Sequence, residues 1–145
     1  MDAEDFVGTW RLVSWELRDA AGTTSYPFGR EALGYLIYAA DGYMSATLMR
    51  PDRPRFAAPD ILGGAVTEQA AAAATCIAYA GPYAVRAEKV VHHVEVSLFP
   101  NWIGTDQERS YAFAGDRLTL STAPLFVAGS EQCAYLILER VAGSA

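Results

Sequence analysis

Two adjacent histidines are the side chains of this sequence best suited to proton-transfer chemistry. They are His92 and His93, within the alternating stretch Val90–Phe99. Neighbouring side chains of a strand point to opposite faces, so at most one imidazole enters an interior, and a joint metal chelate is not expected. His93 shares a face with Glu95, and a carboxylate beside an imidazole fixes its tautomer and raises its basicity. General-base catalysis uses this arrangement.

A cation on the following strand extends this candidate site. Arg109 lies on the same strand face as Tyr111 and Phe113, and two aromatic rings favour an inward orientation for that face. A guanidinium inside a protein requires a carboxylate or an anionic ligand. Glu95 on the adjacent strand is the natural carboxylate. We therefore predict a catalytic cluster of His93 as base, Glu95 as its orienting group and Arg109 as the stabiliser of a developing oxyanion.

The alternation of the histidine strand is also compatible with the opposite orientation. In that case the apolar face that includes Val90, Val94 and Val96 points inward, and His93 and Glu95 lie in solvent. A surface ion pair would then replace the buried cluster. The strand pattern leaves both orientations open.

Composition predicts one folded, acidic domain over residues 1–145. The chain is 52% hydrophobic and 19% charged, which supports a continuous core. Its net charge of −6 disfavours nucleic acid and anionic membranes as partners. An acidic start, unlike a secretory signal, and the lack of a long apolar segment make the cytoplasm the expected location. Cys76 and Cys133 stand alone and are expected to be reduced thiols.

Most of the chain alternates with the period of β-strands and is divided by tight turns. Thr9–Arg18 reads as the first strand and Gln132–Val141 as the last, and Asp41-Gly42 and Gly115-Asp116 mark hairpins. About eight or nine antiparallel strands with short connections predict an all-β, closed up-and-down barrel, whose interior side chains either fill it or leave room for one small ligand. A two-sheet sandwich is the alternative.

One segment departs from the strand pattern. Thr67 and Glu68 suit a helix N-terminus, the Ala70–Ala74 run has high helix propensity, and Gly81-Pro82 is expected to end the element. We predict a helix of about three turns, inserted midway, that acts as a lid on the barrel.

Several stretches, in order along nearly the whole chain, resemble the bacterial and fungal lipocalin-like domain family. They are Gly8-Thr9-Trp10 at the start, Gly34–Tyr38 with Asp41–Ser45, Arg53–Phe56, His92–Glu95, Pro100–Gly104 and Gly115–Leu120. The resemblance implies a calycin-type barrel. It also implies structural roles for Gly8 and for Trp10, whose indole would pack at the closed end beneath Arg140 or, less favourably, Arg117.

The first strand predicts further interior residues. If Trp10 points inward, strict alternation places Ser14 and Glu16 inside as well and leaves Trp15 and Leu17 outside. Two such apolar side chains need a cover, either a neighbouring segment or a second copy of the chain, and a homodimer is therefore expected as one possibility.

The remaining predicted ligand contacts come from hairpins, loops and the end of the helix. Arginines concentrate in the loop before the helix and could attract an acidic ligand group, and tyrosines at the helix exit offer hydroxyl groups. The residues are Tyr38, Met44, Arg53, Phe56, Tyr79, Tyr83, Trp102 and Tyr111.

Three functions fit these observations. The first is binding of a small hydrophobic or aromatic molecule, such as a polyketide-like metabolite of secondary metabolism, in the barrel. The second is isomerase, cyclase or dehydratase chemistry without a cofactor, and the third is a packed interaction module. No Gly-rich phosphate loop and no metal-ligand motif is present in the sequence, so no cofactor is expected.

Overall fold

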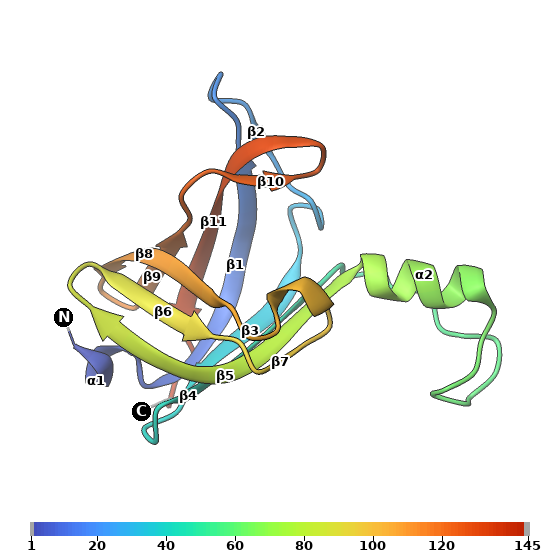
Figure 1. Ribbon diagram of the computed structural model, residues 1–145, viewed down its shortest axis with the longest axis horizontal. Helices are drawn as coiled ribbons and strands as arrows, with labels where there is room; N and C mark the ends of the chain where they lie inside the picture. Colours follow the sequence, from blue (N-terminus) through green and yellow to red (C-terminus); the bar gives the residue numbers. More distant parts are fainter. Residues whose placement is uncertain (1, 144–145) are drawn as a thin grey trace.

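Antiparallel pairing continues around the whole sheet and closes it on itself (Figure 1). The structure, a computed structural model, describes residues 2–143. Each barrel strand pairs with the next along the chain, and the last pairs with the first, which confirms the predicted up-and-down barrel; it has eight strands, where eight or nine were predicted. These strands are β1 (Gly8–Arg18), β3 (Leu33–Tyr38), β4 (Tyr43–Met49), β5 (Cys76–Arg86), β6 (Lys89–His93), β8 (Asp106–Ala114), β9 (Arg117–Ser121) and β11 (Ser130–Arg140).

Shorter elements extend the barrel at its edges and ends. Their bounds are α1 (Ala3–Phe6), β2 (Thr24–Ser25), α2 (Val66–Ala74), β7 (Val96–Ser97), the 3-10 helix η1 (Pro100–Trp102) and β10 (Leu125–Val127). Within residues 2–143, no helix has the length and apolar character needed to cross a membrane.

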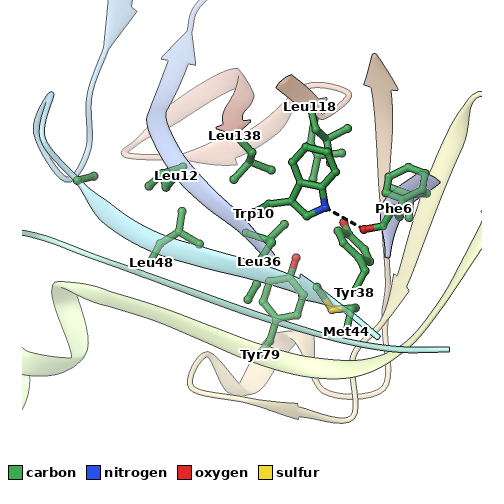
Figure 2. Packing of buried hydrophobic residues seen from close by; sticks show 14 of the residues in the cluster. Phe6, Trp10, Leu12, Leu36, Tyr38, Met44, Leu48, Tyr79, Leu118 and Leu138 are labelled. Atoms are coloured by element: carbon green, nitrogen blue, oxygen red, sulfur yellow. Dashed lines mark hydrogen bonds between the residues drawn. The ribbon is translucent and has the colours of Figure 1, made fainter. Parts of the chain in front are cut away.

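The floor of the barrel is built around Trp10, whose side chain is fully buried. Its indole N–H donates to the carbonyl of Phe6 at 2.8 Å, which holds α1 across the barrel end (Figure 2). The guanidinium of Arg140 lies 4.3 Å from the centre of the indole ring, and it donates to the carbonyl oxygens of Val7 and Asp5 at 2.7 and 2.8 Å. The predicted contact between Trp10 and Arg140 is therefore present, with a cation over an aromatic face and the terminal segment tied to the last strand.

A β-bulge on β1 overturns the predicted interior positions of this strand. Between Leu12 and Ser14 the pairing with β11 shifts by one residue. Such a shift reverses the faces of all later residues because the side-chain period of a strand is two. Trp15 and Leu17 consequently line the interior, whereas Ser14 and Glu16 lie on the outer face. The prediction that Ser14 and Glu16 line the cavity is wrong.

The outer face of β1 is polar as a result. Ser14 donates its hydroxyl hydrogen to Glu16 at 2.9 Å, and Arg18 forms an ion pair with Glu16 at 3.0 Å and stacks on Tyr135. Because Trp15 is inside the barrel, no second copy of the chain is needed to cover it. The homodimer therefore stays a prediction that this strand does not support.

Helix α2 is present but shorter than expected, and it is not a lid. It has 9 residues, it ends at Ala74 rather than at Gly81-Pro82, and β5 runs through that dipeptide. Alanine side chains offer little area to bury, and none of the helix residues is buried. Figure 1 shows α2 projecting away from the barrel beyond the ends of β4 and β5.

Gly81 allows the wall of the barrel to bend where two strands meet β5. The second half of β5 pairs with β6, whereas its first half pairs with β7. A Cβ atom at position 81 would lie 1.9 Å from the carbonyl oxygen of His93, so no side chain fits there. The close approach explains why Val90–Phe99 is two strands rather than the single continuous strand of the prediction.

Candidate ligand-binding site

A cavity of about 130 Å³ occupies the end of the barrel opposite the Trp10 floor. Its walls are mainly apolar and come from six barrel strands together with β10 and η1. Its polar or aromatic members are Trp15, Tyr79, Trp102, Arg109 and Thr122, and its aliphatic members are Leu17, Ala46, Leu48, Ile77, Leu120, Leu125, Val127, Ala134 and Leu136. A concave, mainly apolar space with a few polar groups is typical of sites for small organic molecules.

A buried hydrogen-bonded triad lies at the inner end of this cavity. The imidazole of His92 is 1% exposed, and both of its nitrogens have a tyrosine partner. Nε2 is 2.7 Å from the hydroxyl oxygen of Tyr38, and Nδ1 is 2.8 Å from that of Tyr79. Tyr38 belongs to the packed core, whereas Tyr79 also lines the cavity, so the triad connects the floor with the binding space.

Burial keeps all three members of the triad uncharged. Desolvation, with a smaller contribution from the charge of Arg109, lowers the pKa of His92 from 6.5 to about 3. Desolvation also raises the pKa of Tyr38 well above its ordinary value and raises that of Tyr79. His92 is therefore a neutral imidazole at neutral pH, with one N–H donor and one acceptor nitrogen.

A neutral imidazole donates one of these two hydrogen bonds and accepts the other. If Nε2 carried the hydrogen and donated to Tyr38, the hydroxyl hydrogen of Tyr38 would lack an acceptor in the core, at a cost of about 1–3 kcal/mol. We therefore assign Tyr38 as the donor to Nε2 and Nδ1–H as the donor to Tyr79. In this arrangement the hydroxyl hydrogen of Tyr79 remains available to a molecule in the cavity.

Arg109 of β8 lines the cavity, as predicted from the strand face that it shares with Tyr111 and Phe113. It lies opposite Val90 of β6 in the register, on the same inner face as His92. It donates to the carbonyl oxygen of Glu108 at 3.0 Å and to the side-chain oxygen of Gln107 at 3.4 Å. Among residues 2–143, no carboxylate forms an ion pair with it.

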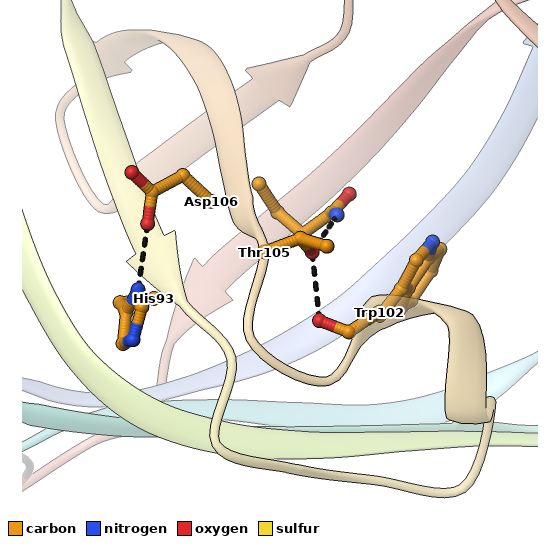
Figure 3. Close-up of polar contacts among 5 residues, drawn as sticks. His93, Trp102, Thr105 and Asp106 are labelled. Carbon is orange, nitrogen blue, oxygen red and sulfur yellow. Dashed lines mark hydrogen bonds and ion pairs between the residues drawn. The ribbon is translucent and has the colours of Figure 1, made fainter.

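The structure does not form the predicted cluster of His93, Glu95 and Arg109. His93 and Glu95 point outward, and His93 instead bonds through Nδ1 to the carboxylate of Asp106 at 2.7 Å, with both side chains about half exposed (Figure 3). Val90 and Val94 are fully buried, so the apolar face of the strand is the inner one. The burial of these valines drives this orientation. With His93 and Glu95 inside, both valines would have been exposed to water.

Two of the other predicted ligand contacts do lie at the cavity. Tyr79 and Trp102 form part of its wall, and their rings meet edge to face with centres 5.5 Å apart. Figure 3 shows Trp102 on η1, where its carbonyl oxygen accepts a hydrogen bond from the hydroxyl of Thr105 at 2.7 Å. Trp102 is half-buried at the rim, as expected of a residue that caps the space.

Arg53 and Phe56 lie away from the cavity, beside α2. Arg53 donates to the hydroxyl of Thr75 at 3.1 Å and to the carbonyl of Ala72 at 2.9 Å, so it caps the end of the helix. Phe56 packs beneath Gly64 in the loop before α2. The prediction that they line the mouth of the barrel cavity is therefore wrong, because α2 projects outward and takes this loop with it.

Tyr38, Met44, Tyr83 and Tyr111 are packing residues below the cavity. Tyr38 and Met44 are buried, and the rings of Tyr38 and Tyr83 meet at 4.9 Å. The hydroxyls of Tyr83 and Tyr111 donate to carbonyls of hairpin turns at 3.0 and 2.8 Å. Tyr38 touches the site only through His92, and the other three do not line it.

The sequence-based reasoning left open whether His92 or His93 faces the interior, and it missed most of the aliphatic wall. His92 shares the apolar face of Val90 and Val94, and this is the one signal that could have placed it inside. Nothing local indicates its partners, which lie 54 and 13 residues away along the chain. Among the described residues, no group of three or more His, Cys, Asp or Glu side chains is arranged to hold a metal ion.

Comparison with known proteins agrees with this architecture. The lipocalin-like domain family matches residues 7–141, which is nearly the entire chain. The chain belongs to the lipocalin-like domain family. A 4'-hydroxy-3'-methoxypropiophenone carrier protein from Aspergillus oryzae is 41% identical to this lipocalin-like protein over an alignment of 102 residues, and the alignment covers 64% of this chain and 92% of the relative. Among solved structures, none matches the chain at a significant level.

Proposed function

We propose that this lipocalin-like protein binds and carries a small aromatic molecule in its barrel cavity. The observation that carries the proposal is the cavity of about 130 Å³ between the Trp10 floor and the rim residue Trp102. An engineered apolar cavity of about 150 Å³ holds one benzene molecule, so this space is close to the size of a single aromatic ring. The similarity to a carrier of an aromatic ketone supports the same class of ligand.

Binding accounts for the interior better than catalysis does. The predicted base, His93, lies outside the barrel, and the inner histidine has both nitrogens engaged and a pKa of about 3. A base with that pKa takes up a proton weakly at neutral pH. A completely packed interaction module is disfavoured by the cavity itself. We further propose that the carried molecule is a product of secondary metabolism, as the polyketide-like ligand of the prediction would be.

The test is a titration with 4'-hydroxy-3'-methoxypropiophenone and related single-ring ketones, followed by tryptophan fluorescence. Two of the chain's three tryptophans, Trp15 and Trp102, line the cavity, so a bound ring is expected to change their emission. Replacement of Ala134 by Phe fills the cavity from β11 and is expected to weaken binding at least about tenfold, because the ligand and the new ring compete for one volume.

A matched control uses the same substitution on the outside of the barrel. Ala112 of β8 is exposed on the outer face, so Ala112→Phe is expected to leave the affinity unchanged. Equal affinities for the wild type and Ala134→Phe, with the fold intact by circular dichroism, would place binding elsewhere and contradict the proposal. Absence of binding by any single-ring aromatic compound would contradict it as well.

A further inference from the structure

We propose that the ligand of this cavity carries an oxyanion on its aromatic ring, as a carboxylate or a phenolate, and that the guanidinium of Arg109 binds it. This inference rests on the proposed binding function and names the chemistry of the ligand. The observation behind it is a cation in the wall of a mainly apolar cavity without a carboxylate partner among residues 2–143.

Most of the N–H donors of Arg109 have no acceptor among the described residues. A guanidinium has five N–H donors in a planar fork. Within the described residues, Arg109 uses one donor on the carbonyl of Glu108 and one, at 3.4 Å, on the amide oxygen of Gln107. Both acceptors are uncharged, so neither neutralises the cation. The unused N–H groups match the geometry of a carboxylate or another oxyanion.

The groups that surround Arg109 on the inner face are neutral or apolar. β6 contributes Val90 and the uncharged imidazole of His92, β5 contributes Tyr79, and η1 contributes Trp102. Tyr38 of β3 is close enough for the charge of Arg109 to affect its pKa, and it too is uncharged. A positive charge beside such walls is costly unless an anion joins it, and the same low polarity strengthens the attraction when one does.

Tyr79 offers a second donor to the ligand. Because His92 donates to its oxygen, the hydroxyl hydrogen of Tyr79 is free to point toward the cavity that the tyrosine lines. An arginine and a tyrosine hydroxyl that line one cavity provide charge-assisted hydrogen bonds to an oxyanion, whereas the charge of the arginine repels an ammonium group. The site therefore selects anions over cations as well as over neutral rings.

The test compares matched pairs of ligands that differ in charge but hardly in shape. Benzoate and benzamide form one pair, and 4-nitrophenolate and 4-nitroanisole, at alkaline pH where the free phenol is ionised, form the other. The wild type is expected to bind the anion of at least one pair about tenfold tighter or more, the effect of one hydrogen bond to a charged group. The pair with the larger ratio identifies the oxyanion as carboxylate or phenolate.

Two variants test whether Arg109 is responsible for the preference for the anion. Arg109→Met retains the length and apolar stem of the side chain, so it is expected to bind the neutral compounds and to lose the preference for the anion. Arg86→Met makes the same replacement at the exposed last residue of β5 and is expected to keep that preference.

Two results would overturn the inference while leaving the proposed binding function intact. They are equal or tighter binding of the neutral member in both pairs by the wild type, and an unchanged anion preference in Arg109→Met. If neither anions nor neutral aromatic compounds bind, the proposed function fails and this inference fails with it.

Discussion

Acid is expected to destabilise this barrel through one residue, His92. Its pKa is about 3 in the folded protein, against 6.5 for an exposed histidine. Below pH 6.5 the unfolded chain therefore takes up a proton that the folded protein does not, and the stability contributed above that pH is lost as the pH falls. Each pH unit in this window costs about 1.36 kcal/mol, so a change from pH 7 to pH 5 costs about 2 kcal/mol through His92 alone.

His92→Gln tests this coupling because glutamine does not titrate. The variant is expected to be less stable than the wild type at neutral pH by about 1–3 kcal/mol, since one tyrosine hydroxyl loses its partner. On acidification it is expected to lose about 2 kcal/mol less than the wild type does between pH 7 and pH 5. Urea unfolding followed by circular dichroism at several pH values measures the two slopes.

The chain has two histidines, so His93→Gln is the matched control. His93 is about half exposed, and its replacement is expected to keep the wild-type loss of stability in acid. All carboxylates are common to the three proteins, and only Asp106, the partner of His93, changes its surroundings in the control, so the comparison of the wild type with His92→Gln is free of carboxylate effects. Parallel loss of stability in the wild type and His92→Gln would refute the reasoning, because it would show that His92 is protonated equally in the folded and unfolded states.

Two further predictions concern the scaffold around the site. Gly81→Ala is expected to lower the free energy of unfolding by at least about 2 kcal/mol, because its Cβ would collide with the carbonyl of His93. The control Gly22→Ala, in an open turn at φ +83, is expected to lower it by about 1 kcal/mol. Urea unfolding compares the two variants, and equal losses of stability would contradict the close packing at Gly81. Arg140→Met is expected to lower the free energy of unfolding by about 2 kcal/mol and to make α1 susceptible to proteolysis. The reason is that the cation over Trp10 and the hydrogen bonds to two carbonyls are lost together. Limited proteolysis that leaves α1 as resistant as in the wild type would count against this role of Arg140.

The barrel follows from local patterns that the sequence contains. Alternating residues and tight turns such as Asp41-Gly42 predict successive antiparallel strands, and such strands with short connections close into an up-and-down barrel. The contact of Trp10 with Arg140 also follows from the family pattern, because both residues lie at the ends of strands that must meet on closure. The alanine run likewise predicts a helix, although its position relative to the barrel depends on packing that alanine does not specify.

The candidate site was only partly predictable, and two errors show why. On β1 a single extra residue exchanged the inner and outer faces, so Trp15 replaced Glu16 in the interior. On β6 the alternation was correct but left both orientations open, and the predicted catalytic cluster required the one that the structure does not adopt, so His92 rather than His93 is the buried imidazole. In both cases the face that is inside follows from the total apolar area buried, which is a property of the whole barrel.

The sequence by itself determined the secondary structure period, the barrel and the presence of Arg109 among aromatic residues on one strand face. Only the tertiary structure decided which imidazole lies inside, that two tyrosines from other strands hold it, and that no described carboxylate accompanies the arginine. The physical reason is that the alternation of a strand defines two faces but not which of them lies inside. Closure of the sheet determines the inner face, and it brings together Tyr38, His92 and Tyr79, which lie far apart along the chain.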